Sequence, residues 1–211
     1  MIDLYTWTTP NGRKVSILLE ELCIPYTVHS IDISKNEQFA SDFLKIAPNN
    51  RIPAIIDQET GVHLMETGAI MMYLASKHRK FQCRGDEYWR MVEWMMWQVG
   101  GLGPMLGQLH HFVKYNKGTS AYAEKRYQTE AKRLYSVLNE RLAGRDFIAG
   151  EGNGVYSIAD IACWPWVSRF EWQEIDLRDF SNIRDWYVRI AGRPAVQRGY
   201  SVPKFTTEVP M

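Results

Sequence analysis

The residues best suited to chemistry lie in two short segments, 49–57 and 66–68. In the first, Pro53 opens a run of β-branched residues, although proline cannot donate to a strand ladder. A cis Ile52–Pro53 bond would turn the backbone N–H and C=O of Ile52 outward, where an extended peptide could pair with them. Glu66 and Thr67 stand at a predicted helix start, whose N–H groups can bind a carboxylate. These segments predict a site for a small peptide with an acid group; an ordinary surface turn before an edge strand is the alternative.

Length and composition exclude several classes of protein. The 211 residues are 45% hydrophobic, enough for a core in one large domain or two small ones. The formal net charge is +1 and no basic block is present, which argues against nucleic-acid binding. No apolar run approaches the roughly 20 residues that span a bilayer, and the first residues lack signal-peptide character. We therefore expect a cytoplasmic protein.

The cysteines and histidines do not form a metal or disulfide pattern. Cys23, Cys83 and Cys163 are widely spaced, with no CxxC and no Cys/His ligand spacing. We expect Cys23 and Cys163 on apolar helix faces and Cys83 exposed in a joint between domains. His110 and His111 are adjacent, so on a helix they point apart. No metal is expected, although one of the two histidines could line a substrate pocket.

The first 80 residues predict a compact α/β layer domain with the order βαβαββα. Alternating apolar residues and turn signals predict strands at 2–7, 26–31, 54–57 and 62–65. Helical spacing of apolar residues predicts helices at 11–23, 37–46 and 67–78. Thr9 or Asn11 is suited to cap the first helix, with Pro10 in its first turn.

After residue 80 the strand signal disappears, and the polar segment 82–86 marks a domain boundary. The predicted domains are 1–80 and 86–211. Periodicity predicts an aromatic-rich helical stretch at 87–113, interrupted by a glycine-rich break at 100–104, and helices at 120–142, 157–170 and 179–191. Ser157 and Asp160 predict a capping box. The polar tail after Pro194 is expected to be extended.

Three separated motifs in this order resemble the glutathione S-transferase superfamily over essentially the whole chain. They are Asn50-Arg51-Ile52-Pro53, Glu66-Thr67-Gly68-Ala69-Ile70 and Ser157-Ile158-Ala159-Asp160. Segments 8–12, 97–105 and 161–166 are most similar to bacterial nu-class enzymes related to the yeast regulator Ure2. The resemblance implies a thioredoxin-like N-terminal domain, an all-helical C-terminal domain and a homodimer.

The resemblance also implies roles for individual residues. Thr9 and Asn11 would face the glutathione sulfur, where a helix N-terminus and hydroxyl or amide donors lower the thiol pKa. The alternative for both residues is helix capping alone. The glutathione-binding residues would be Gln38, Arg51, Ile52, Glu66, Thr67 and Arg126, with Pro53 as the cis-proline.

The absence of a CxxC motif affects which activity we expect. Without its own cysteine pair at residues 8–11, the protein would rely on bound glutathione for thiol–disulfide chemistry. The resemblance implies a glutathione-dependent disulfide-bond reductase with weak transferase and peroxidase activity. A conventional glutathione S-transferase that conjugates electrophiles and a non-catalytic, Ure2-like regulatory protein are the alternatives.

Overall fold

The computed structural model describes residues 1–210. These residues form two compact units, one made of residues 1–80 with the segment from 191 onward, the other of residues 81–190. The sequence assigned the segment from 191 onward to the second domain, but it packs with the first. Within residues 1–210, no helix has both the length and the apolar character needed to cross a membrane.

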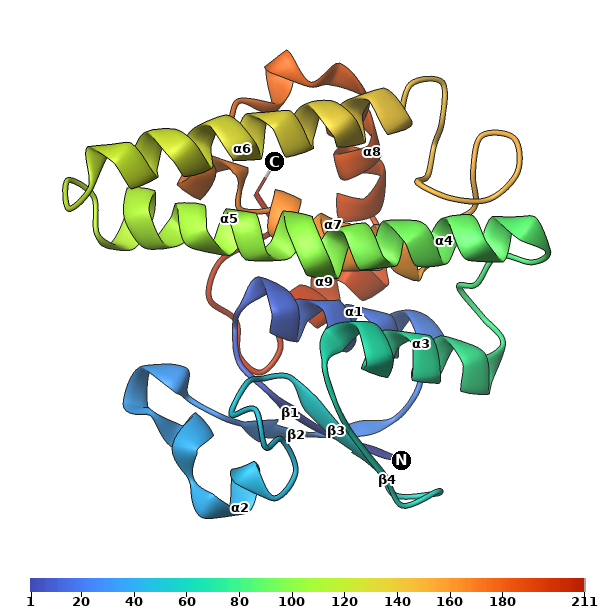
Figure 1. Ribbon diagram of the computed structural model, residues 1–211. Helices are drawn as coiled ribbons and strands as arrows, with labels where there is room; N and C mark the ends of the chain where they lie inside the picture. The colour runs from blue at the N-terminus through green and yellow to red at the C-terminus, as the bar shows by residue number, and fades with distance from the viewer. Residues whose placement is uncertain (211) are drawn as a thin grey trace. The chain divides into compact units, whose positions relative to one another are not determined.

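The first unit is built on a four-stranded mixed sheet in the order β2-β1-β3-β4 (Figure 1). Its strands are β1 (Ile2–Thr6), β2 (Tyr26–Ser30), β3 (Ala54–Asp57) and β4 (Val62–Met65). Strand β1 is parallel to β2 and antiparallel to β3, with Leu4 opposite Val28 and Ile55. Because side chains alternate along a strand, Leu4 and Ile55 share one buried face, while Tyr5 and Ala54 share the other.

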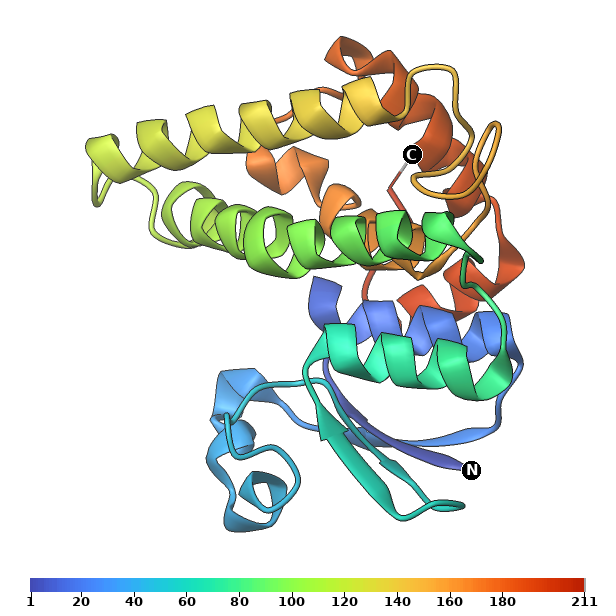
Figure 2. The same cartoon turned by 45° about the vertical axis from the view of Figure 1, so that its right-hand side comes forward.

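Helices cover both faces of this sheet. The longer helices α1 (Pro10–Leu22) and α3 (Thr67–His78) lie on one face, and the short α2 (Ser41–Leu44) lies on the other (Figures 1 and 2). Buried Asp57 at the end of β3 ties α3 to the sheet, since it accepts hydrogen bonds from Lys77 and Tyr73, both at 2.6 Å. Burial opposes ionisation of Asp57, but these bonds outweigh it and lower the pKa to about 2.

The segment before β3 differs from the predicted helix at 37–46. Two 3₁₀ turns, Ile33–Lys35 and Glu37–Phe39, precede α2, so only Ser41–Leu44 is α-helical. Phe39, which lies within the predicted helix, is 52% exposed. Ala40, between the second turn and α2, has an extended backbone with a ψ of 137°, and this breaks the helical path.

The tail after Pro194 is not simply extended, because Pro194–Tyr200 form helix α9. This helix packs against α1 so closely that a Cβ on Gly199 would lie 2.6 Å from the Cα of Ile17. Buried Arg13 of α1 donates to the carbonyl of Tyr200 at 3.0 Å and to the hydroxyl of Thr206 at 3.0 Å. The sequence-based prediction missed this helix because the residues of α1 that it contacts are more than 180 positions away, 187 and 183 in two hydrogen bonds.

The second unit is helical apart from its loops and one isolated antiparallel bridge between Ala149 and Val155. Its main helices are α4 (Asp86–Trp97), α5 (Gly103–Leu109), α6 (Ala121–Arg141), α7 (Ile158–Val167) and α8 (Ser181–Ala191). Shorter 3₁₀ turns span Phe170–Gln173 and Leu177–Asp179. Helix α6 runs alongside α5 in both views (Figures 1 and 2). Every residue of α7 is buried, so this helix forms the centre of the unit.

The glycine-rich segment 100–104 does not interrupt the helical stretch as the sequence suggested. Gln98–Leu102 form a π-helical turn that leads directly into α5, and a second π-helical turn, His110–Tyr115, follows α5. A Cβ on Gly103 would lie 2.8 Å from the amide nitrogen of Gln98 and 3.3 Å from the indole nitrogen of Trp166. Close packing therefore accounts for Gly103, whereas Gly100 and Gly101 have no neighbour within 4 Å of a Cβ position.

The predicted capping box at the start of α7 is confirmed. Asp160 is fully buried and accepts four hydrogen bonds. The donors are the backbone N–H and hydroxyl of Ser157, the N–H of Ile148 and the indole N–H of Trp186, at 2.9 to 3.1 Å. One carboxylate thus joins the start of α7, the preceding loop and α8.

The structure reverses two expectations about the cysteines. Cys23 is exposed and Cys83 is buried, while Cys163 is buried as predicted. Cys23 lies at the C-terminal end of α1 with a φ of 56°, so the helix ends there and its side chain leaves the apolar face. Burial raises the pKa of the Cys83 thiol to about 11, so this thiol stays protonated at neutral pH.

Candidate functional site

The first unit contains a pocket of about 240 Å³ where the two predicted segments meet. The lining residues come from the first turn of α1, the loop before β3, the end of β4 and the start of α3: Asn11, Asn49, Arg51, Ile52, Pro53, Met65, Glu66 and Thr67. The pocket therefore brings together Asn11, Arg51, Ile52 and the Glu66–Thr67 pair, which the sequence singled out separately.

Ile52 presents its backbone beside the end of a strand. The Ile52–Pro53 bond is cis, and β3 begins only at Ala54. Within residues 1–210, the N–H and C=O of Ile52 have no hydrogen-bond partner. The side chain is buried in a cluster with Phe43, Ala47 and Ala54. The backbone of Ile52 can therefore pair with an extended ligand while its side chain anchors the loop.

The start of α3 supplies the second half of the pocket. Glu66 has a φ of 70°, unusual for a residue with a Cβ, and makes no side-chain cap of its own helix. The first bond of the helix runs from the Ile70 N–H to the Glu66 carbonyl at 2.9 Å, so the N–H groups of Thr67 and Gly68 have no acceptor within the helix. An exposed carboxylate and a helix N-terminus thus stand side by side, suited to an ammonium and a carboxylate respectively.

Two residues at this pocket were not predicted as site residues. The amide nitrogen of Asn49 lies 3.5 Å from the Glu66 carboxylate. The ammonium of Lys14 lies 3.3 Å from the Thr67 hydroxyl, and Lys14 is only 1% exposed. Asn49 opens the segment 49–57, which the sequence did single out, whereas Lys14 follows Arg13 in a helix of mixed polarity and carried no distinguishing signal.

Thr9 is the N-cap of α1, and its hydroxyl accepts from the N–H of Gly12 at 3.1 Å. The turn is tight, because a Cβ on Gly12 would lie 2.1 Å from the carbonyl oxygen of Trp7. Thr9 does not line the pocket, whereas Asn11, two residues later, does. Thr9 therefore caps α1. Because its hydroxyl oxygen accepts in this bond, the hydroxyl proton remains available to a second acceptor.

Gln38 and Arg51 differ in their environments. Arg51 is exposed and lines the pocket. Gln38 lies in the 3₁₀ turn Glu37–Phe39, is buried and does not line it. Its side-chain oxygen has no hydrogen-bond partner within the described residues. The structure thus places Arg51, but not Gln38, in the pocket with Asn11, Ile52 and the Glu66–Thr67 pair.

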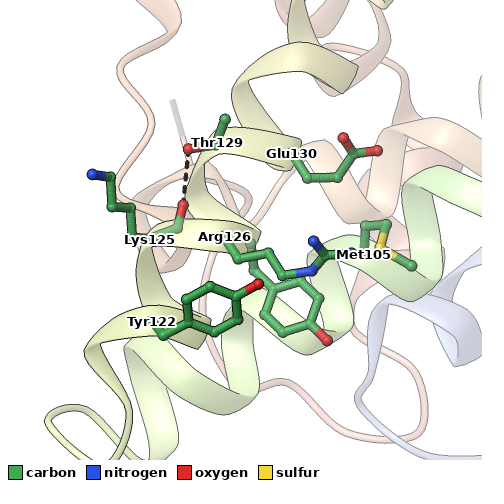
Figure 3. A pocket seen from close by; sticks show the side chains of 7 residues that line it. Met105, Tyr122, Lys125, Arg126, Thr129 and Glu130 are labelled. Carbon is green, nitrogen blue, oxygen red and sulfur yellow. Dashed lines mark hydrogen bonds between the residues drawn. The ribbon is translucent and has the colours of Figure 1, made fainter.

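Arg126 belongs to the second unit, where it lines a pocket of about 690 Å³ (Figure 3). The lining residues are Met105, Tyr122, Lys125, Arg126, Tyr127, Thr129 and Glu130. Glu130 is held by Arg133 through hydrogen bonds at 2.7 and 2.8 Å, which lower the pKa of its carboxyl group. The pocket lining thus combines two exposed cations, Lys125 and Arg126, with the Glu130 carboxylate and aromatic rings.

His110 does not line either of these pockets. It is buried, stacks on Trp166 and has its Nε2 3.1 Å from the amide nitrogen of Gln173. Burial lowers the pKa of His110 to about 4, so the imidazole is neutral at pH 7. Residues 1–210 contain no group of three or more His, Cys, Asp or Glu side chains arranged to hold a metal ion.

The chain belongs to the glutathione S-transferase family. The family's N-terminal domain model matches residues 1–76 and its C-terminal domain model matches residues 102–194. The resemblance and the fold predicted from the sequence, a thioredoxin-like domain followed by an all-helical one, are thereby confirmed.

Disulfide-bond oxidoreductase YfcG from Escherichia coli is 47% identical over 92% of each chain. A glutathione transferase from Burkholderia graminis, solved with two glutathione molecules per subunit, is 40% identical with a TM-score of 0.89, over 96% of this chain and 88% of that one. A Pseudomonas putida glutathione transferase, solved with one glutathione disulfide per subunit, is 36% identical with a TM-score of 0.89, over 96% and 91%.

Proposed function

We propose that this protein is a glutathione-dependent disulfide-bond reductase. The observation that carries the proposal is the pocket of the first unit, whose groups complement the parts of glutathione. In the reaction, two glutathione thiols reduce one disulfide to two thiols and leave as glutathione disulfide, so no further reductant is needed. The three cysteines of the chain do not line this pocket.

The proposal gives a role to each residue that the sequence predicted for the site, whether or not it lines this pocket. The Glu66 carboxylate accepts from the γ-glutamyl ammonium, and the N–H and hydroxyl of Thr67 donate to the adjoining carboxylate. The backbone of Ile52 pairs with the cysteinyl part, and Arg51 and Gln38 serve the glycine end. Thr9 and Asn11 donate to the sulfur, which with the N-terminus of α1 favours the thiolate. Arg126 contributes a cation for a glutathione carboxylate.

Relative rates on two substrates test the activity. Thr9 and Asn11 provide weaker thiolate stabilisation than a Tyr or Ser site, so we expect disulfide exchange to exceed conjugation. The purified protein is assayed with glutathione and a model disulfide, and separately with an aryl halide. Faster turnover of the aryl halide would favour a conventional transferase. Absence of glutathione binding in calorimetry would favour a regulatory protein.

A homodimer is part of the proposal. On α4, Trp89 is 68% exposed and Met96 is 47% exposed, and their seven-residue spacing puts them on one helix face. Gly100, one turn further, has open space around it, which would let a second copy approach closely. We expect light scattering to give about twice the monomer mass of 24.6 kDa. A mass of one chain at micromolar concentration would contradict the dimer.

A cytoplasmic location completes the proposal. Reduced glutathione and free thiols are maintained in that compartment, and the three cysteines form no disulfide with one another. Recovery of the protein in a membrane or secreted fraction after cell fractionation would oppose this assignment.

A further inference from the structure

The pocket of the first unit contains a chemically labile pair of residues, Asn11 and Gly12. An asparagine followed by glycine loses its side-chain ammonia more readily than other asparagines, because glycine has no Cβ to hinder the attacking nitrogen. Asn11 lines the pocket, and both residues belong to the first turn of α1. The sequence contains one other such pair, Asn153–Gly154, whose asparagine is exposed in a turn of the second unit.

The packing at the start of α1 fixes the second residue of this pair. A Cβ on Gly12 would lie 2.1 Å from the carbonyl oxygen of Trp7 and 2.5 Å from the hydroxyl oxygen of Thr6. The shorter contact is with backbone, so no rotation of a side chain relieves it. Residue 12 must therefore be glycine, and the asparagine in the pocket is followed by the residue that makes it most reactive.

The reaction consumes only water. The backbone nitrogen of Gly12 attacks the side-chain amide carbon of Asn11, and its proton passes through solvent to the departing nitrogen. Ammonia leaves, and a five-membered cyclic imide remains. Water then opens the imide at either carbonyl, which gives aspartate or isoaspartate. Ring closure requires the backbone of Asn11 to leave the helical ψ of about −42°.

We propose that Asn11–Gly12 is a deamidation site that the first turn of α1 keeps unreactive. Asn11 is the second residue of the helix, so its backbone is held in the helical conformation. The Gly12 N–H donates to the Thr9 hydroxyl at 3.1 Å, and the Arg13 N–H donates to the Thr9 carbonyl at 3.0 Å. The turn has to open before the ring can close. Since opening is fast and deamidation slow, the rate follows the fraction of open turns.

Deamidation would place a carboxylate where the pocket now has an amide. The amide of Asn11 has N–H donors, whereas an ionised carboxylate only accepts, and its charge opposes a nearby thiolate. This consequence rests on the proposed function, in which Asn11 donates to the glutathione sulfur. Thr9 would then act on the site in a second way, because its cap preserves the neighbouring donor.

The test measures deamidation by peptide mass spectrometry after incubation of the full-length protein at mildly alkaline pH. The same protein in urea gives the rate without the fold. We expect Asn11 to react roughly tenfold or more slowly in the folded protein than in urea. In folded Thr9→Ala the rate at Asn11 should rise about fivefold, which corresponds to the ~1 kcal/mol that an N-cap contributes. The rate at Asn153 should not change.

Thr9→Ser is the matched control, because serine keeps the acceptor for Gly12 and should keep Asn11 protected. If Asn11 reacts as fast in the folded protein as in urea, or equally fast in Thr9→Ala and Thr9→Ser, the inference is wrong. Circular dichroism checks each fold. Should Thr9→Ala not fold, Thr9→Val, which has a similar shape but no acceptor, is held to the same fivefold rise. These readouts are masses, so a failure to bind glutathione would refute the proposed function and leave the result at Asn11 standing.

Discussion

The Thr9→Asp variant is expected to keep its melting temperature and to lose about a hundredfold in kcat/KM for glutathione-dependent disulfide reduction. Thr9 caps α1 by accepting from the Gly12 N–H at 3.1 Å. Aspartate caps helices at least as well as threonine. Its carboxylate, however, has no proton to donate and would repel a thiolate. The substitution thus retains the structural role of Thr9 and removes only the proposed catalytic one.

Two measurements check this result. Steady-state kinetics give kcat/KM, and the ultraviolet absorbance of the thiolate gives the pKa of bound glutathione, which should rise in Thr9→Asp. Thr9→Ser is the matched control, because serine keeps both the cap and the hydroxyl donor. If Thr9→Asp remains as active as Thr9→Ser, Thr9 is only a helix cap and the thiolate is stabilised elsewhere.

Asp160→Ala is expected to lower the free energy of unfolding by about 3–5 kcal/mol. Alanine would leave the four donors on Ser157, Ile148 and Trp186 buried without their acceptor. Each such group loses hydration that nothing in the fold restores. For a chain of this length the melting temperature should fall by roughly 10 °C.

Calorimetric or circular-dichroism melting of Asp160→Ala measures the effect. Asp185→Ala is the matched control, since the Asp185 side chain is 67% exposed and lies on α8, one residue before Trp186. The control should melt within about 1–2 °C of the unmodified protein. A similarly small change in Asp160→Ala would mean that water replaces the carboxylate, and that Asp160 does not hold α7 and α8 together.

The strands and the helix around the pocket were predictable because residues with strong local preferences mark where each of them begins and ends. Pro53 fixes where β3 can begin, and the turn residues 59–61 separate it from β4. Glu66 and Thr67 then mark the start of α3. The predicted bounds 54–57, 62–65 and 67–78 therefore equal those of the structure. Such signals act over a few residues and do not depend on the remainder of the fold.

The sequence did not predict the burial of Lys14 or helix α9, because both depend on contacts between distant parts of the chain. Lys14 follows another cation, and a polar pair on a helix predicts an exposed face. Its burial depends on α1 having neighbours on several sides, including α3 and α9. The short helix α9 was missed for the same reason: it is stabilised where Gly199 meets Ile17. Sequence patterns identify a helix and its apolar face. They do not show that a further helix, here α9, also packs against it on another side.

The return of α9 to α1 has a consequence for protein synthesis. Residues 81–190 form a unit that is continuous along the chain, whereas the first unit lacks part of its packing until the segment from 191 onward is made. At about 5–20 residues per second, the ribosome needs roughly 5 to 20 s for the intervening segment. The portion translated first is therefore completed last. During that interval the surface of α1 that will receive Gly199 is uncovered, and the nascent chain is open there to chaperones or to mispairing.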